Sequence, residues 1–91
     1  MTIVWTDYMR YRARMRGYEL DKIERLLTES GERYLDTVTR RLVTVGRHGR
    51  HLVIVPYEVD KESVVPVTIH ATTREQIKYR VRVGRFVREE E

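Results

Sequence analysis

A β-like run ends and a helix begins within the segment Val67-Thr-Ile-His70-Ala-Thr-Thr-Arg74-Glu-Gln-Ile-Lys-Tyr-Arg80. Thr72 with Glu75, or Thr73 with Gln76, fits a capping box that predicts a helix to about residue 83. Gly84 is expected to stop that helix. If Val65, Val67 and Ile69 point to the core, alternation places Thr68 and His70 on the opposite, open face of the sheet.

Short β-branched runs precede this stretch. They predict strands at residues 33–35, 42–45, 52–57 and 64–69. The segments 46–49 and 60–63 have the composition and length of hairpin turns, so the four strands are expected to form an antiparallel meander. Pro56 and Pro66 lack a backbone N–H, and each should mark a strand end, a bulge or an edge.

The N-terminal third has helical periodicity. A short apolar run at residues 3–5 precedes a predicted helix at 7–16, with Thr6 or Asp7 as N-cap and Gly17 as its end. Tyr8, Tyr11 and Met15 form an apolar stripe on this helix, and residues 19–29 form a second amphipathic helix. The two helices are expected to pair and to cover the sheet, because neither is long enough to be stable alone.

These elements predict one α+β domain of two layers, built from residues 1–88 and followed by an acidic tail at 89–91. Its order is a short N-terminal strand, a two-helix hairpin, the four-stranded meander and a C-terminal helix. The absence of Cys excludes disulfides, thiolate metal sites and cysteine nucleophiles. Neither a signal peptide nor an apolar run of membrane-spanning length is found, which predicts a cytoplasmic protein without membrane contact.

The charge pattern points to a polyanionic partner. The net charge is +4, and it is +7 without the three C-terminal glutamates. Arginine outnumbers lysine by 15 to 3, and its planar fork binds phosphate oxygens in pairs and stacks on bases. Nucleic acid is therefore the leading partner class. The alternative is that the arginines reflect genome composition or the ion-pair networks of a heat-adapted protein.

Two motifs are similar to those of known families. Arg12-Ala-Arg-Met-Arg16-Gly17 resembles the Arg-x-x-x-Arg-Gly signature of a small uncharacterised domain family, with Tyr8 where a histidine usually stands. Ala71-Thr-Thr-Arg74-Glu-Gln-Ile-Lys-Tyr79 resembles the Ala-Thr-x-Arg-Glu-x-x-x-Tyr run that follows the last strand in BrnT-like proteins. Together with the order of elements, the motifs make the chain similar to the RelE/ParE toxin superfamily and its BrnT-like branch.

This resemblance implies the toxin of a type II toxin-antitoxin system. The expected activity is metal-independent endoribonuclease cleavage, without a cofactor, of RNA that could lie on the ribosome. The expected partner protein is a cognate antitoxin, and the expected assembly is a homodimer or a toxin-antitoxin complex. Two alternatives stay open, because fold does not fix function: a catalytically silent RelE-fold module that binds nucleic acid or protein, and a ParE-like toxin with a protein target.

Metal-free RNA cleavage needs a base, cations for the phosphoryl oxygens and an acid. The candidate catalytic residues are His70, Arg74, Tyr79 and Arg80. Each has a structural alternative: a hydrogen-bonded strand-end histidine for His70, an ion pair with Glu75 or Glu58 for Arg74, and a packing ring for Tyr79.

Further basic residues are candidates for RNA contact. For the basic residues of the first helix, the alternatives to RNA contact are a solvated surface or the binding of an acidic antitoxin segment. In the turn at 46–51 the alternative is a solvated hairpin tip, and no zinc site is expected because carboxylates are lacking nearby. On the last helix, a basic stripe of Arg74, Lys78 and Arg85 is expected. The RNA-binding candidates are Arg12, Arg16, Arg47, His48, Arg50, Lys78 and Arg85.

Overall fold

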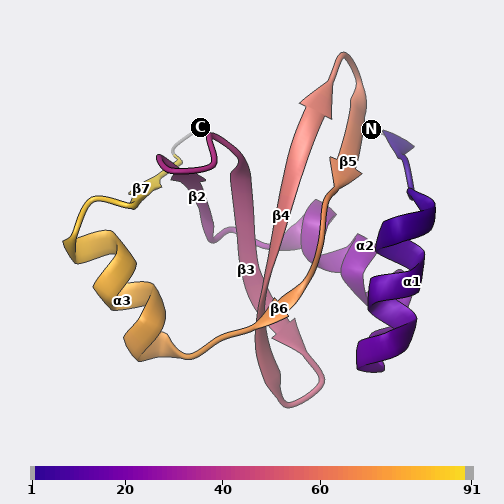
Figure 1. Cartoon of the computed structure of the whole chain (residues 1–91), viewed down its shortest axis with the longest axis horizontal. Helices are drawn as coiled ribbons and strands as arrows, with labels where there is room; N and C mark the ends of the chain where they lie inside the picture. The colour runs from indigo at the N-terminus through magenta and orange to yellow at the C-terminus, as the bar shows by residue number, and fades with distance from the viewer. Residues whose placement is uncertain (1, 90–91) are drawn as a thin grey trace.

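The structure is a computed structural model, and it describes residues 2–89. Glu90 and Glu91 of the expected acidic tail lie outside the described residues. The domain is α+β, as predicted, with three helices and a mixed open sheet (Figure 1). Its elements are β1 Thr2–Ile3, α1 Asp7–Arg16, α2 Leu20–Glu29, β2 Arg33–Asp36, β3 Leu42–His48, β4 His51–Asp60, β5 Ser63–Pro66, β6 His70–Ala71, α3 Arg74–Arg82 and β7 Phe86–Arg88.

The predicted meander forms the centre of the sheet. Strands β2, β3, β4 and β5 pair in antiparallel fashion in this order. Two edge strands extend the sheet: β1 lies parallel to β5, and β7 lies antiparallel to β2. The sequence did not predict β7, and its presence is one reason why the sheet is larger than the expected meander.

The helix ends follow the predicted capping chemistry. The Met9 N–H donates to Thr6 Oγ1 at 3.1 Å, and Gly17 ends α1 with a φ of 75°. In the third helix, the Gln76 N–H donates to Thr73 Oγ1 at 3.2 Å, so Thr73 is the N-cap. These side chains satisfy backbone donors that the first helical turn leaves free. Because α3 ends at Arg82, Arg85 lies beyond the helix and the expected helical stripe with Arg74 and Lys78 is wrong.

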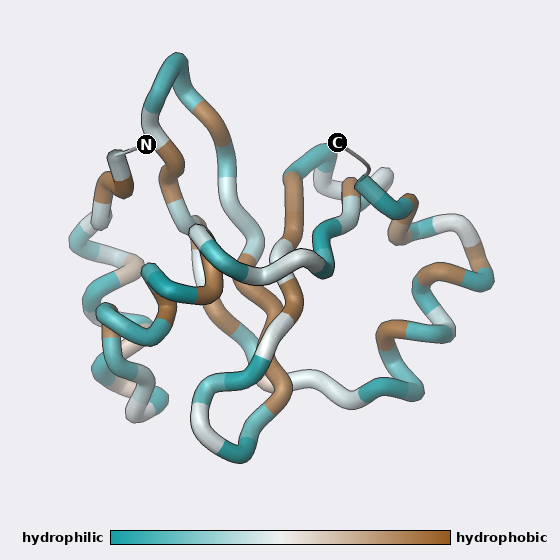
Figure 2. The backbone as a smooth tube through the Cα atoms, turned by 180° about the vertical axis from the view of Figure 1, so that it is seen from behind, coloured by the Kyte–Doolittle hydropathy of each residue, from teal (hydrophilic) through white to brown (hydrophobic). Residues whose placement is uncertain are grey.

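Strand alternation divides the apolar side chains between the two faces of the sheet. On one face, Val53 and Val55 of β4 pack with Met9, Ile23 and other residues of α1 and α2. On the opposite face, Ile54 of β4 packs in a second cluster that includes Ile77 of α3. The expected two-layer arrangement is therefore wrong, because α3 lies on the face opposite to α1 and α2. Figure 2 shows the hydrophobic segments in the strands and hydrophilic segments at the hairpin tips.

The buried stripe of α1 is not the predicted one. Met9 and Ala13 are buried, while Tyr8, Tyr11 and Met15 are exposed. The buried pair and the exposed set both repeat at helical spacing. The sequence pattern predicts the buried stripe from the larger side chains, and it therefore favoured the exposed set. A small alanine at the interface allows α1 to lie close to its neighbours, so Met9 and Ala13 are sufficient to anchor it. No helix within residues 2–89 has the length and apolar character needed to span a membrane.

The last predicted strand is divided in two. Strand β5 ends at Pro66, as expected for a proline, and β6 begins at His70 after a break over residues 67–69. At this break the Val67 N–H donates to the Pro56 carbonyl at 2.8 Å. Val64 and Ile69 face the α1–α2 core, whereas Val67 does not. The expected common face of Val65, Val67 and Ile69 is therefore wrong, because the break shifts the alternation.

Candidate functional site

A groove lies on the face of the sheet that α3 covers in part. Its volume is about 470 Å³. It runs between α3 and the segment 67–71, with an apolar floor and a polar rim that includes three arginines. The floor consists of Val43, Ile54, Pro56, Val67, Ala71 and Phe86, and the polar lining consists of Asp36, Thr39, Arg41, Thr68, His70, Gln76, Arg80 and Arg85.

His70 lies at the rim of this groove, beside the Arg16 guanidinium. Arg16 Nη1 lies 3.2 Å from His70 Nδ1 and donates to the Ile69 carbonyl at 3.2 Å. Burial and the charges of Arg16, Arg12 and Arg80 lower the pKa of His70 below its ordinary value. Since Arg16 can only donate, His70 Nδ1 accepts and the neutral ring carries its proton on Nε2. That proton is available to an anion.

The cations around His70 come from two helices on opposite faces of the sheet. Arg80 of α3 lines the groove and lies over the Phe86 ring, 5.4 Å from its centroid. Arg12 of α1 donates from Nη1 to the Tyr8 hydroxyl at 2.7 Å, and its buried Nε has no partner within residues 2–89. The topology thus brings three predicted site residues together: Arg16 contacts His70, and Arg80 lines the same groove as His70. The charge of Arg12, a fourth predicted residue, also acts on His70.

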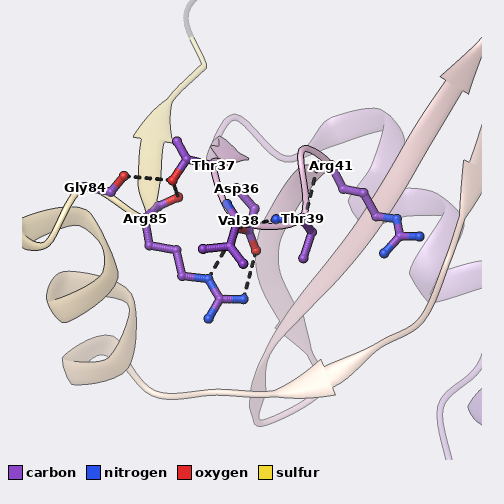
Figure 3. Close-up of polar contacts among 7 residues, drawn as sticks. All are labelled: Asp36, Thr37, Val38, Thr39, Arg41, Gly84 and Arg85. Carbon is purple, nitrogen blue, oxygen red and sulfur yellow. Dashed lines mark hydrogen bonds and ion pairs between the residues drawn. The ribbon is translucent and has the colours of Figure 1, made fainter.

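The far wall of the groove holds an ion pair. Figure 3 shows the Arg85 guanidinium against Asp36, with Nε 3.3 Å from Oδ1 and Nη2 3.2 Å from Oδ2. The Val38 and Thr39 N–H groups also donate to Asp36. Burial alone would raise the pKa of Asp36, but the Arg85 contact and these N–H donors outweigh it and lower the pKa. Arg85 therefore neutralises a buried carboxylate, and its charge is less available to a ligand.

Arg74 and Lys78 lie on the other flank of α3. They line a separate groove of about 490 Å³ with Tyr34 and Arg88. Arg74 Nη1 donates to Glu32 Oε2 at 2.7 Å, so its ion pair is with neither Glu75 nor Glu58. Burial opposes ionisation of Glu32, but the contacts with Arg74 and Tyr34 outweigh it and lower the pKa of Glu32. The structure does not bring Arg74 together with His70.

Tyr79 and the hairpin residues are also separate from His70. The Tyr79 ring is exposed on α3, with Arg82 over it at 5.8 Å. The β3–β4 hairpin turns at Gly49 and Arg50 rather than over residues 46–49. Arg50 and Arg47 are exposed there, and Arg47 Nη1 donates to the Arg50 carbonyl at 3.2 Å.

His48 has a structural position. Its ring is buried, and its Nε2 accepts the Glu19 N–H at 2.8 Å. The Tyr18 ring packs on it edge-on with centroids 5.0 Å apart. His48 therefore supports the start of α2 and does not extend from the hairpin tip toward a ligand.

The predicted site residues did not include five polar residues of the groove, among them Thr68 and Gln76. Thr68 has a buried hydroxyl without a partner within residues 2–89. Gln76 lines the groove, and its side-chain oxygen accepts from the Thr72 hydroxyl at 3.0 Å. Alternation along the strand had predicted Thr68 on the same face as His70, and both line the groove. Within residues 2–89, no three His, Asp or Glu side chains come together as metal ligands would.

Comparisons with models of protein families, with curated proteins and with solved structures gave no match.

Proposed function

We propose that this domain binds RNA at the groove beside His70 and acts there as a metal-independent endoribonuclease of the RelE/ParE toxin type. One observation carries the proposal: Arg16 contacts a half-buried histidine at the rim of an apolar-floored groove that Arg80 also lines. Guanidinium groups bind phosphate oxygens in charge-assisted pairs. An apolar floor beside them suits a sugar or a base, so the combination favours a nucleotide chain over an inorganic anion.

Cleavage would use His70 in its neutral form. Its lowered pKa keeps the ring able to accept a proton from the 2′-hydroxyl. In the free protein Arg16 contacts Nδ1. A phosphate would compete for this guanidinium, and release of Arg16 would free Nδ1 as the base. Attack of the 2′-oxygen on phosphorus would form a 2′,3′-cyclic phosphate and break the bond to the 5′-oxygen, which would take a proton from water. Arg80 and Arg12 would stabilise the charge that develops on the phosphoryl oxygens.

A catalytically silent module that binds nucleic acid is the second candidate. One observation favours it: Arg74 is held by Glu32 in a different groove, so the predicted catalytic set does not converge. Both candidates share the phosphate site at His70 and differ only in whether a bond is broken. A cognate antitoxin remains the expected partner of the toxin form.

The test uses purified protein, labelled single-stranded RNA and EDTA. We expect binding that weakens with salt, together with cleavage. Arg80→Ala should weaken binding and reduce the dependence of log affinity on log salt by about 1, the effect of one phosphate contact. Arg25→Ala is the matched control, since Arg25 is an exposed helical arginine near Glu29 on α2.

Three outcomes separate the candidates. Loss of cleavage but not of binding in His70→Ala supports the ribonuclease. If the wild-type protein binds RNA and leaves it intact, the catalytically silent module is supported instead. Wild-type protein without measurable affinity for RNA at low salt overturns the proposal.

A further inference from the structure

The outer face of α1 carries large side chains that the fold does not cover. Tyr8 is 54% exposed, Tyr11 is 57% exposed and Met15 is 66% exposed. At 100° per residue the three lie within about 60° of one another. The anchoring residues Met9 and Ala13 lie on the inner side of the same helix. The protein thus presents two aromatic rings to solvent, close together on one rigid element.

The same helix has an uncompensated positive charge. Arg10, Arg12, Arg14 and Arg16 are spaced two residues apart along it, and within residues 2–89 none of them forms an ion pair. Arginines four apart, such as Arg12 and Arg16, repel each other on a helix surface. A bound polyanion would relieve this repulsion along the whole helix.

This face is continuous with the groove. Arg12 contacts the Tyr8 hydroxyl through Nη1, and its guanidinium lies over the Tyr8 ring at 5.8 Å. Arg12 and Arg16 also act on His70 at the groove rim. A chain whose phosphate lies beside His70 would therefore meet Tyr8 next, and then Tyr11.

We propose that α1 is a stacking platform for single-stranded RNA that leaves the His70 groove, with bases on the Tyr8 and Tyr11 rings and phosphates on the flanking arginines. The inference rests on the proposed function and specifies its substrate as unpaired RNA. Base faces stack on exposed aromatic rings whatever their sequence. The bases of a duplex are already stacked on each other and do not offer their faces. A polyanion that also offers flat rings matches this helix better than an acidic peptide, which would meet the charges but would leave the tyrosines without stacked partners.

The experiment compares the affinity of the whole chain for single-stranded and double-stranded RNA of equal length. We expect a preference for the single strand. Tyr8→Ala with Tyr11→Ala should weaken single-strand binding at least about fivefold and leave the salt slope unchanged, because stacking involves no counterion release. Tyr8→Phe with Tyr11→Phe keeps both rings but removes the Tyr8 hydroxyl that contacts Arg12, and it should bind more tightly than the alanine variant. Val59→Ala, a change at an exposed apolar residue of β4, is the control.

A second measurement needs no substitution. Photo-crosslinking of 5-bromouridine RNA to the wild-type protein should label Tyr8 or Tyr11. If single and double strands bind equally, or if the alanine variant retains full affinity and no crosslink forms on α1, the platform is overturned while RNA binding at the groove stands. An alanine variant that loses binding of an acidic peptide but not of RNA would assign this face to a protein partner instead. Complete absence of RNA binding overturns the proposed function and, with it, this inference.

Discussion

The two faces of the central sheet have different contents although the same strands build them. On one face Val53 and Val55 lie under α1 and α2, and both are fully buried. On the other face Ile54 and Pro56 form part of the floor of a groove with charged walls. Figure 1 shows α1 and α3 at opposite sides of the sheet. Neighbouring residues of one strand therefore serve the core and the candidate site in turn.

This difference indicates how a small domain separates stability from binding. The period of two along a strand lets one residue change without moving the side chain on the opposite face. The face under α1 and α2 and the buried second cluster under α3 should therefore tolerate few changes in volume. The open part of the groove face should tolerate changes in volume but not in charge. Substitutions on each face test this difference.

The largest loss is expected on the covered face. Ile23 of α2 is fully buried, and Ile23→Ala should lower the free energy of unfolding by about 2–5 kcal/mol through lost burial and a residual cavity. Val67→Ala on the groove floor, where the side chain is half-buried, should cost about 1 kcal/mol or less. Urea denaturation followed by circular dichroism measures both. Equal losses would contradict the division between the faces.

The ion pair at the far wall of the groove is the next largest expected effect. Arg85→Ala leaves the buried Asp36 carboxylate without its bidentate partner and should cost about 1–3 kcal/mol at pH 7. Arg85→Lys keeps a positive charge without the planar fork of the guanidinium. Its free energy of unfolding should lie between those of wild type and Arg85→Ala. Thermal or urea unfolding of the three proteins gives the order.

The pH dependence of this loss identifies its cause. The pKa of Asp36 is lowered in the folded protein, so its stabilising effect is present above the unfolded pKa and disappears as the pH falls through the folded value. The difference between wild type and Arg85→Ala should therefore shrink on acidification from pH 5 toward pH 3. A difference that stays constant over this range would mean that Arg85 acts through packing rather than charge.

Local signals made much of the fold predictable. Helix caps such as Thr6 and Thr73 and the stop at Gly17 act within one turn of the chain, so α1 has the predicted bounds. The short strand β7 was not predictable in this way. Its three residues have no turn signal of their own, and they form a strand because Tyr34, Leu35 and Asp36 of β2 are available to pair with them.

The candidate site was predictable in composition but not in grouping. The sequence singled out His70 and Arg80, and both line the groove. Arg16 contacts His70 from 54 positions away, and nothing local in the sequence specifies such a contact. For the same reason the sequence could not show that Glu32 lies beside Arg74.

The N-cap of α3 should have a moderate effect, because this helix supplies Arg80 to the groove face. Thr73→Ala removes the acceptor of the Gln76 N–H and should cost about 0.5–2 kcal/mol. Thr72→Ala is the matched control, since Thr72 contacts the Gln76 side chain rather than the helix backbone. If Thr72→Ala costs as much as Thr73→Ala, the capping assignment is wrong.

The smallest effect is expected at His70. Its pKa is lowered by burial first and then by Arg16, Arg12 and Arg80. As the pH falls, His70 is therefore protonated at a higher pH in the unfolded chain than in the folded chain. The stability that depends on neutral His70 is full above pH 6.5 and declines as the pH falls toward the folded pKa. His70→Asn removes the titration and should flatten the pH dependence of unfolding over this interval.

A bound anion should reverse part of this shift. A phosphate beside the ring offsets the guanidinium charges, so the pKa of His70 should rise in the presence of inorganic phosphate or short RNA. NMR titration of the ring resolves it from the exposed His51 and from the buried His48. A rise at His70 that His51 does not share places the anion beside His70. An equal rise in the pKa of both histidines would reflect general screening and would contradict the assignment of the groove as the phosphate site.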